Sequence, residues 1–249
     1  MGSDLWRENV NETKVALITG SSRGIGRQLA LDCSRYGLSV VVNYVGSEAA
    51  AQEIVDQVTH SGSKAIAVRA DVSVPGDVET LIGRTLEHFG RLDCVINNAG
   101  VGNTTALEKL DAAQFETTLR VNLLSAFLVS QATIPHMKAR GGRLIFMSSI
   151  AARTGGGISA AYAASKAGLE GLMHYYATYL LADRITSNAI APALIASDMV
   201  KAMKLPSLEA LPLGRLGQPA EIWPAVRMIL ETEYMTGQTI HINAGRYMT

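Results

Sequence analysis

The chain has few cysteines and histidines and no long apolar run, the features on which disulfide scaffolds, metal sites and membrane-spanning helices depend. Its two cysteines, Cys33 and Cys94, form no CxxC pair, which excludes a disulfide scaffold, and we interpret both as small buried hydrophobes. Its five histidines are scattered and form no HExxH motif, so no metal site is predicted. The chain also lacks a run of 18 apolar residues, so we expect no membrane-spanning helix.

The chain also has no excess of positive or negative charge. The 22 basic and 22 acidic side chains give a net charge of zero, which argues against a dedicated nucleic-acid binder. The first thirteen residues are polar and partly acidic, so we interpret residues 1–13 as an N-terminal extension and not as a signal peptide. The 48% share of hydrophobic residues is ordinary for a globular cytoplasmic enzyme, the class and compartment that we expect.

The order of strand-like and helix-like segments predicts the fold. Runs rich in β-branched residues predict buried parallel strands at residues 15–19, 39–44, 65–70, 94–97, 143–148, 186–191 and 239–242. Helical periodicity lies between them at 25–36, 48–61, 77–89, 113–140, 162–182 and 220–231. This alternation predicts one domain over residues 14–249, a doubly wound α/β Rossmann fold with a seven-stranded parallel sheet and helices on both faces. The irregular, proline-containing stretch at about 192–218 is predicted to be a substrate loop.

The first strand runs directly into a glycine cluster, TGSSRGIG at residues 19–26, and a helix follows. The spacing G-x-x-x-G-x-G is a variant of the dinucleotide-binding fingerprint. Glycine lets the backbone approach a pyrophosphate without a Cβ in the way, and the helix N-terminus presents free N–H groups. A glycine cluster also fits a simple tight turn, but its place between a strand and a helix favours nucleotide binding.

The end of the second strand indicates which nucleotide is preferred. An enzyme that uses NAD usually has Asp or Glu there to bind the ribose 2′-hydroxyl, whereas this chain has Asn43, Tyr44 and Val45. The guanidinium of Arg23 in the glycine cluster can pair with a 2′-phosphate, although a solvated loop arginine is the alternative. The sequence therefore predicts NADP(H) as the preferred cofactor and leaves NAD(H) open.

A possible catalytic group follows the fifth strand. The run Ser148-Ser149 ends that strand, and Tyr162 and Lys166 begin the next helix. Residues four apart leave the same face of a helix, so the two side chains are expected to lie together. The Tyr-x-x-x-Lys spacing alone is only moderately specific. Its position in a chain that carries the glycine cluster makes it a strong signal.

These motifs together resemble the short-chain dehydrogenase/reductase family from about residue 14 to residue 248. The chain also carries Asn97-Asn98-Ala99-Gly100 after the fourth strand, Asp71-Val72 after the third, and Asn122 in the long helix. Ser149 stands thirteen residues before Tyr162, as the family's catalytic serine does. The sequence is most similar to bacterial 3-oxoacyl-acyl-carrier-protein reductases and to their broad-specificity ketone-reducing relatives.

The resemblance implies a role for each catalytic residue. Tyr162 would donate a proton to a carbonyl oxygen while hydride arrives from the nicotinamide, and Ser149 would polarise that carbonyl. Lys166, with the oxidised nicotinamide ring, would lower the pKa of Tyr162 and would bind the nicotinamide ribose. Asn122 would disturb its helix locally and hold a water in a proton relay.

The resemblance also implies the cofactor site and the assembly. The implied cofactor-binding residues are Gly20, Ser22, Arg23, Gly24, Ile25, Gly26, Asn43, Asp71, Val72, Asn98, Ala99, Gly100, Tyr162, Lys166, Pro192, Ile195 and Ser197. Singly, Ser149, Asn122 and Asp71 also fit plain roles at a strand end, on a helix and in a turn. A homotetramer is implied, with the helices at 113–140 and 162–182 between subunits.

Four departures from the family pattern lie near the expected substrate entrance. Ala193 replaces the usual glycine after Pro192, and it would be strained if that position needs a positive φ. Ser197 replaces a threonine, Ala244 replaces a glycine near the end of the chain, and the loop at 199–211 is shorter than usual. The resemblance therefore leaves the substrate less certain than the hydride chemistry.

An acidic acyl carrier protein requires basic residues beside the active-site entrance. Arg140 matches a docking arginine of the family, whereas the second position holds Asp183 with Arg184 next to it. The leading substrates are small-molecule or acyl-thioester carbonyls, with 3-oxoacyl chains on a carrier protein placed first. The alternatives are a broad ketone reductase, a sugar or secondary-alcohol dehydrogenase, and a nucleotide sensor without turnover.

Overall fold

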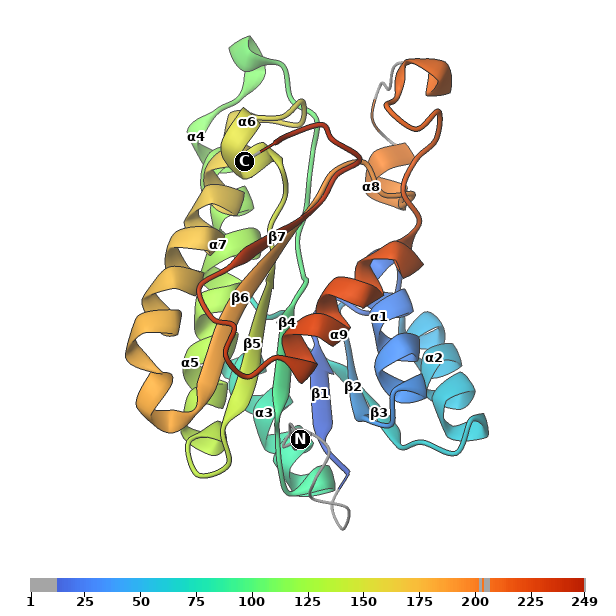
Figure 1. The fold of residues 1–249 in the computed structure, drawn as a ribbon, viewed down its shortest axis with the longest axis vertical. Coiled ribbons are helices and arrows are strands. Elements are labelled where there is room, and N and C mark those ends of the chain that lie inside the picture. The colour runs from blue at the N-terminus through green and yellow to red at the C-terminus, as the bar shows by residue number, and fades with distance from the viewer. Residues whose placement is uncertain (1–12, 202, 204–206, 249) are drawn as a thin grey trace.

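The computed structural model describes residues 13–201, 203 and 207–248, and most of the expected N-terminal extension lies outside this range. The described residues form one seven-stranded parallel sheet in the order β3-β2-β1-β4-β5-β6-β7 (Figure 1). The strands are β1 (Val15–Ile18), β2 (Ser39–Tyr44), β3 (Ala65–Arg69), β4 (Cys94–Asn97), β5 (Gly142–Met147), β6 (Ile185–Pro192) and β7 (Thr239–Ile242). The doubly wound fold is confirmed, and each strand end lies within one residue of its predicted position.

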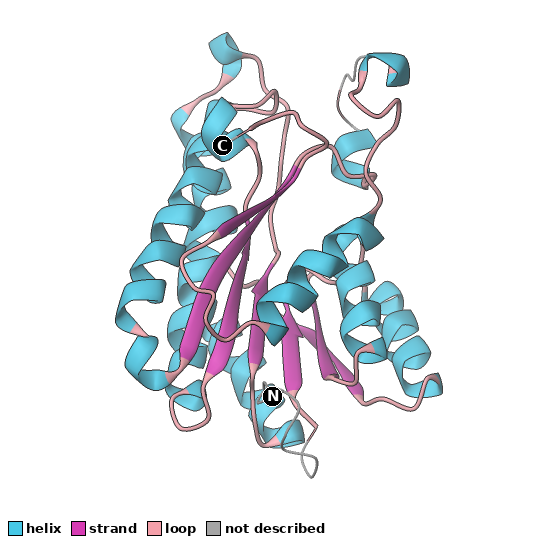
Figure 2. Ribbon diagram, in the orientation of Figure 1, coloured by secondary structure: helices cyan, strands magenta, loops and turns pink. Residues whose placement is uncertain are grey.

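Helices cover both faces of the sheet (Figure 2). One face packs against α1 (Gly24–Arg35), α2 (Glu48–His60) and α9 (Trp223–Glu231), and the other against α3 (Pro75–Phe89), α5 (Ser125–Met137) and α7 (Ala160–Tyr179). Successive side chains of a strand point to opposite faces, so Ala16 and Ile18 belong to one hydrophobic core while Val15 and Leu17 belong to the other. In the described part of the chain, no helix combines the length and the apolar character needed to cross a membrane.

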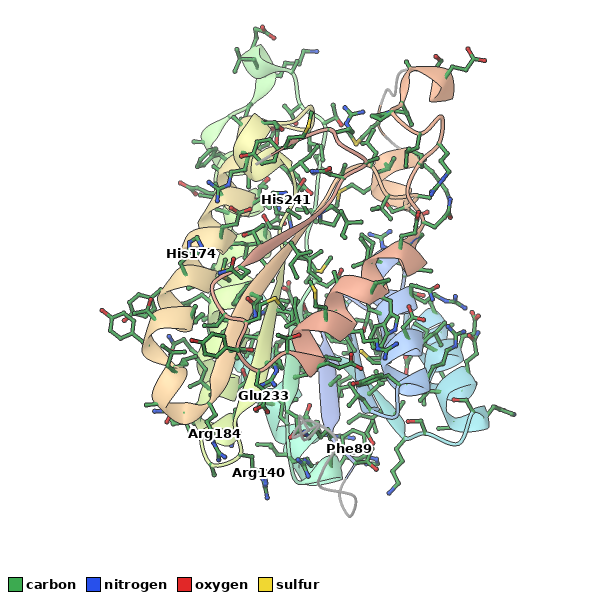
Figure 3. All side chains as sticks on the ribbon, viewed as in Figure 1. Phe89, Arg140, His174, Arg184, Glu233 and His241 are labelled. Atoms are coloured by element: carbon green, nitrogen blue, oxygen red, sulfur yellow. The ribbon has the colours of Figure 1, made fainter. Side chains whose placement is uncertain are left out.

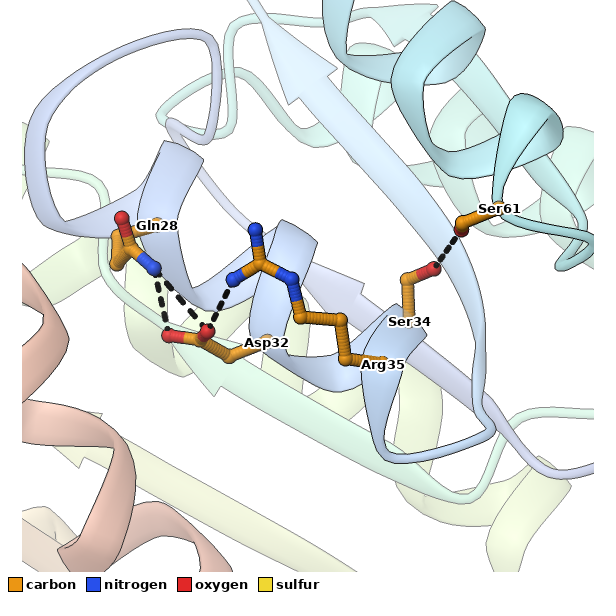
Figure 4. A network of polar contacts seen from close by, with 5 residues as sticks. All are labelled: Gln28, Asp32, Ser34, Arg35 and Ser61. Atoms are coloured by element: carbon orange, nitrogen blue, oxygen red, sulfur yellow. Dashed lines mark hydrogen bonds and ion pairs between the residues drawn. The ribbon is translucent and has the colours of Figure 1, made fainter.

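Polar contacts fix the helix that follows the glycine cluster (Figure 4). On α1, the carboxylate of Asp32 accepts hydrogen bonds from Gln28 Nε2 at 3.0 Å and from Arg35 Nη1 at 2.9 Å. Ser34 Oγ lies 3.4 Å from Ser61 Oγ at the end of α2, which joins the two helices. The C-terminal half of α1 is therefore linked to the end of α2.

The predicted helix at 113–140 is the largest difference between expectation and structure. It is divided into α4 (Ala112–Leu119), a π-helical turn at Arg120–Leu124, and α5, which ends at Met137. The π-helical turn contains Asn122, and such turns often occur at functional sites. Two helices of a single turn, α6 (Ala151–Thr154) and α8 (Asp198–Lys201), were not predicted, because one turn is too short to show periodicity.

Candidate active site

A cavity of about 970 Å³ opens at the carboxyl ends of the strands. The order of the strands reverses between β1 and β4, and in open α/β sheets ligands bind in the crevice at such a point. The segments that follow all seven strands contribute to its wall. The fold therefore creates one site from residues that are far apart in the sequence.

The structure brings nearly all the predicted site residues to this cavity. Its wall includes Gly20, Ser22, Arg23, Gly24, Ile25, Gly26, Asn43, Asp71, Val72, Asn98, Ala99, Gly100, Ser149, Tyr162, Lys166, Pro192, Ile195 and Ser197. Asn122 is the one predicted site residue that is not part of the wall. Among the described residues, no group of three His, Cys, Asp or Glu side chains is arranged to hold a metal ion.

The glycine loop after β1 is shaped to receive a phosphate. A Cβ on Gly26 would lie 2.6 Å from both Asn98 Nδ2 and the carbonyl oxygen of Gly20, so only glycine fits there. The loop is held by Asn43, whose Oδ1 accepts from Gly20 N at 3.0 Å, and by Asn98, whose Nδ2 donates to Gly20 O at 3.1 Å. No side chain caps the N-terminus of α1, so its N–H groups are available to an anion. These residues fit a dinucleotide pyrophosphate.

Three residues at this end of the cavity were not predicted. Val45, Gly46 and Ser47 follow β2 and line the wall beside Arg23 and Asn43. Ser47 caps α2, because its Oγ accepts a hydrogen bond from Ala50 N at 3.4 Å. The signal available in the sequence was their position directly after the second strand, at the same edge of the sheet as the glycine loop.

The predicted catalytic residues lie on neighbouring elements that line the same cavity. Ser159 caps α7 by accepting from Tyr162 N at 3.2 Å, so the helix begins just before the tyrosine. Lys166 Nζ lies 5.5 Å from the centre of the Tyr162 ring and donates to the carbonyl oxygen of Met147 at 2.7 Å. The Tyr162 hydroxyl forms a hydrogen bond with Ser149, which follows β5. The three side chains predicted to act together are therefore adjacent.

Burial controls the protonation of this group. Burial raises the pKa of Tyr162 above its ordinary value near 10, and the hydrogen bond with Ser149 lowers it by less. Burial also lowers the pKa of Lys166 from 10.5 to about 8. The expectation of a lowered tyrosine pKa is therefore wrong for the protein's own groups, because desolvation outweighs the favourable contacts of the phenolate.

Comparison with known proteins identifies the family. A family profile described as "Enoyl-(Acyl carrier protein) reductase" matches residues 20–246. The chain belongs to the short-chain dehydrogenase/reductase family. It is therefore an oxidoreductase that acts on the C=O/CH–OH pair, and the cofactors of this family are nicotinamide nucleotides.

Individual relatives agree with this assignment. A 3-oxoacyl-[acyl-carrier-protein] reductase of Synechocystis is 38% identical over 240 residues, covering 94% of this chain and 97% of its own. A tetrahydroxynaphthalene reductase of Pestalotiopsis fici is 37% identical and covers 93% of this chain and 91% of its own. A crystal structure from Burkholderia xenovorans, assigned to the same family, has a TM-score of 0.86 at 30% identity and covers 94% of this chain and 97% of its own.

Asn122 supports the site of this oxidoreductase from behind the cavity wall. Its side chain is buried, and its Oδ1 accepts from Val101 N at 2.8 Å while its Nδ2 donates to Ser165 Oγ at 3.0 Å. Val101 lines the cavity and Ser165 precedes Lys166 on α7. The structure thus gives the Asn122 side chain a positioning role, and its place in a proton relay stays a prediction.

A buried carboxylate that sequence reasoning missed contacts Ser148, the residue before the predicted catalytic serine. Glu170, one turn after Lys166 on α7, accepts from Ser148 Oγ at 3.0 Å and pairs with Arg153 Nη2 at 2.7 Å. Arg153 is part of α6, the single turn that follows Ser149. Glu170 therefore ties the segment after β5 to the helix that carries Tyr162. In the sequence, Glu170 lies on a helical segment that also carries Lys166, so nothing in the pattern indicated that its carboxylate is buried.

The substrate end of the cavity is largely apolar, with Ile158, Leu194 and Met199 in its wall. The expected strain at Ala193 is absent, since Arg184 and Ala244 are the only non-glycine residues with positive φ in the described part of the chain. Ala244, in contrast, has a φ of 51°. The expected shortening of the loop at 199–211 falls partly outside the described residues.

The expected carrier-protein arginine does not lie beside the entrance within one chain. Arg140 and Arg184 lie together at the opposite end of the molecule (Figure 3), immediately before β5 and β6 begin. Ser149 follows the other end of β5, so the whole length of the strand separates it from Arg140. Asp183 is paired with Lys138 at 3.4 Å, which compensates its negative charge.

Proposed function

We propose that this enzyme reduces 3-oxoacyl thioesters with NADPH. The observation that carries the proposal is that Ser149, Tyr162 and Lys166 meet at one end of a single cavity whose other end is the glycine loop. In this arrangement a carbonyl substrate bound at Ser149 would lie beside a proton donor and in the same cavity as the dinucleotide. Relatives at 37–38% identity that are named 3-oxoacyl-[acyl-carrier-protein] reductases support the substrate class.

The residues divide the reaction between them. When bound, reduced nicotinamide supplies the hydride that adds to the carbonyl carbon as the C=O π bond breaks. The Ser149 hydroxyl holds the carbonyl oxygen, and the Tyr162 hydroxyl gives that oxygen its proton, so the product is an alcohol. The raised pKa of Tyr162 keeps the phenol protonated at neutral pH, which suits a proton donor. Lys166 is fixed beside the ring by its bond to Met147.

The preference for NADPH is supported at the adenosine end of the cavity. Asn43 occupies the position where a ribose-binding carboxylate usually stands, and its amide is used to hold the glycine loop. Arg23 is exposed and lines the cavity, and Ser47 lies at the N-terminus of α2 on the same wall. A guanidinium and a helix N-terminus both favour a phosphate over a hydroxyl.

The function is tested by initial rates with NADPH and NADH on a short 3-oxoacyl thioester and on a simple diketone. We expect the thioester with NADPH to be fastest, with at least about a tenfold preference over NADH that Arg23→Ser removes. Turnover of the diketone alone would instead support a broad ketone reductase, the candidate favoured by the apolar substrate end and the tetrahydroxynaphthalene reductase relative. A preference for NADH would overturn the role given to Arg23.

Carbonyl reduction should depend on pH through Lys166. Because its pKa is about 8, the ammonium is present below pH 8 and is lost as the pH rises through that value. We therefore expect kcat/KM for reduction to be level near neutral pH and to fall above pH 8, while Tyr162 stays protonated. In Lys166→Arg the guanidinium does not titrate, so this fall should disappear.

A second measurement and a contradicting outcome complete the test of the Lys166 pH dependence. If Lys166→Arg turns over too slowly, NADPH binding followed by fluorescence between pH 6 and about 10 gives the same comparison. A wild-type profile that is level up to pH 10, or the same fall in the arginine variant, would assign the pH dependence to another group.

The oligomer proposed here is a homotetramer that uses the face formed by α5 and α7. Large apolar side chains are exposed on this side of the molecule, namely Leu124, Phe127, Tyr175 and Tyr179. Tyr179 is 67% exposed in one chain, and Tyr175 packs against it at 4.5 Å between ring centres. Contiguous exposed apolar groups of this kind mark interfaces.

Light scattering is expected to give four times the 26.5 kDa of one chain. Tyr179→Glu should shift the mass toward smaller species, because it places a charge in the apolar face, whereas Tyr234→Glu should not. Tyr234 is more exposed than Tyr179 but lies outside α5 and α7. A wild-type mass of 26.5 kDa would contradict the proposal.

A further inference from the structure

A cation near the C-terminus lines the active-site cavity without an assigned role. Arg246 is part of the wall of the large cavity and also of a smaller cavity of about 100 Å³ beside it. The two cavities share the segment at 193–195, which follows β6. Arg246 was not among the residues that the motifs pointed to.

A tight turn holds Arg246 in this place. Asn243 Nδ2 donates to Tyr247 O at 2.7 Å, its Oδ1 accepts from Gly245 N at 2.9 Å, and its carbonyl accepts from Arg246 N at 3.0 Å. The turn requires Ala244 to adopt a positive φ of 51°, a conformation that costs an alanine energy. The Tyr247 ring packs against His241 at 5.2 Å. The side chain of Arg246 therefore leaves a well-fixed backbone.

The charges around Arg246 leave it without a counter-ion in the described residues. The acidic side chains that line the two cavities are Asp71, Asp198 and Glu221. Asp71 accepts from Ser73, Asp198 lies near Arg23 and Lys201, and Glu221 forms two hydrogen bonds with Arg215. Among the described residues, Arg246 forms no ion pair with any of them.

The walls of the two cavities also contain several large apolar side chains. Leu194 is shared by the two cavities, and Met199 lies close to Ile158 across Gly102, where an added Cβ would meet both side chains within 3.3 Å. A site that combines apolar side chains with a guanidinium lacking an ion pair among the described residues suits a ligand with an apolar body and one anionic group. The planar fork of arginine matches the oxygens of a carboxylate or a phosphate.

We propose that Arg246 binds an anionic group of the carbonyl substrate, so that the enzyme prefers substrates carrying a carboxylate or a phosphate to neutral ketones. The inference rests on the proposed reductase function and adds its specificity-determining residue. The anion has two chemical sources, namely the carboxylate of a free 3-oxo acid and the phosphate of a pantetheine arm. The geometry favours neither, so both are tested.

Two matched substrate pairs separate the sources. Acetoacetate is compared with its neutral ethyl ester, and acetoacetyl pantetheine 4′-phosphate with acetoacetyl pantetheine. We expect wild type to favour the charged member of at least one pair by about tenfold in kcat/KM at low salt. Arg246→Met should abolish that preference and leave the neutral substrates unchanged. The preference should also shrink as salt is added, because Arg246 is exposed.

Arg84→Met is the matched control. Arg84 is an exposed arginine on α3, away from both cavities, and its loss changes the net charge equally. This variant should keep the wild-type preference. Calorimetric titration with pantetheine 4′-phosphate provides a readout that needs no turnover. Arg246→Met should bind this compound more weakly than wild type does, whereas Arg84→Met should bind it as wild type does.

The outcomes separate this inference from the function on which it rests. If wild type reduces charged and neutral members equally, or if Arg246→Met keeps the preference, the assignment of Arg246 is wrong and the reductase function stands. If Arg246→Met weakens NADPH binding and slows every substrate alike, the residue serves the cofactor instead. If none of the four substrates is reduced, the proposed function fails, and the inference fails with it.

Discussion

Tyr162→Phe is expected to reduce kcat by about 10²–10⁴-fold, the usual contribution of a positioned proton donor. The substitution removes only the hydroxyl that is hydrogen-bonded to Ser149 and keeps the buried ring in place. Affinity for NADPH should change little, because the glycine loop and the adenosine end lie elsewhere in the cavity. Steady-state rates and a fluorescence titration with NADPH measure the two effects separately.

The control for this variant is on the same helix. Tyr176→Phe also removes a buried tyrosine hydroxyl, here one that accepts a hydrogen bond from Gln131 Nε2 at 3.2 Å, but Tyr176 is not part of the cavity wall. Its kcat should stay near that of wild type. If Tyr162→Phe retained activity, the proton would have to come from another group, and the mechanism proposed for this site would be wrong.

Gly26→Ala is expected to raise the Kd for NADPH by at least about tenfold. The added Cβ would lie 2.6 Å from the Gly20 carbonyl oxygen and 2.8 Å from Ser21 Cα, so the backbone of the loop must move. Overpacking of this kind typically costs 1–3 kcal/mol of stability, about the range we expect here. Fluorescence titration gives the affinity, and thermal unfolding gives the change in stability.

Gly83→Ala provides the matched comparison. Gly83 is an exposed glycine within α3, and an added Cβ there meets nothing within 4 Å. This variant should be more stable than wild type by about 0.5–1 kcal/mol, because alanine restricts the unfolded chain, and should bind NADPH normally. Normal NADPH binding by Gly26→Ala would mean that the loop after β1 is not the phosphate site.

Local pattern determined much of this protein. Buried parallel strands consist of β-branched runs ended by polar or glycine residues, so each strand was placed within one residue of its observed ends. The glycine cluster and the Ser149, Tyr162 and Lys166 spacing required particular side chains at particular backbone positions. Because these requirements fix residue types at fixed spacings, they can be recognised in the sequence, and the family resemblance rests on them.

Helix interiors and charges were less well predicted. The segment predicted as one helix at 113–140 contains a π-helical turn at Asn122, whose side chain forms hydrogen bonds with the backbone of Val101, 21 positions earlier in the chain. The direction of the Tyr162 pKa shift depends on how deeply α7 packs against β5, which no local pattern records. Hydrophobic periodicity describes one segment at a time, so it does not predict contacts between segments.

The sequence by itself therefore determined the elements, the family and the residue types available for hydride transfer to a carbonyl. Only the tertiary structure decided where these residues meet. It placed Arg140 at the opposite end of the sheet from Ser149 and brought Arg246, 84 residues after Tyr162, to the wall of the same cavity. The physical reason is that strand order and the turn after β7 are fixed by packing across the whole sheet, and they set which distant residues share a site.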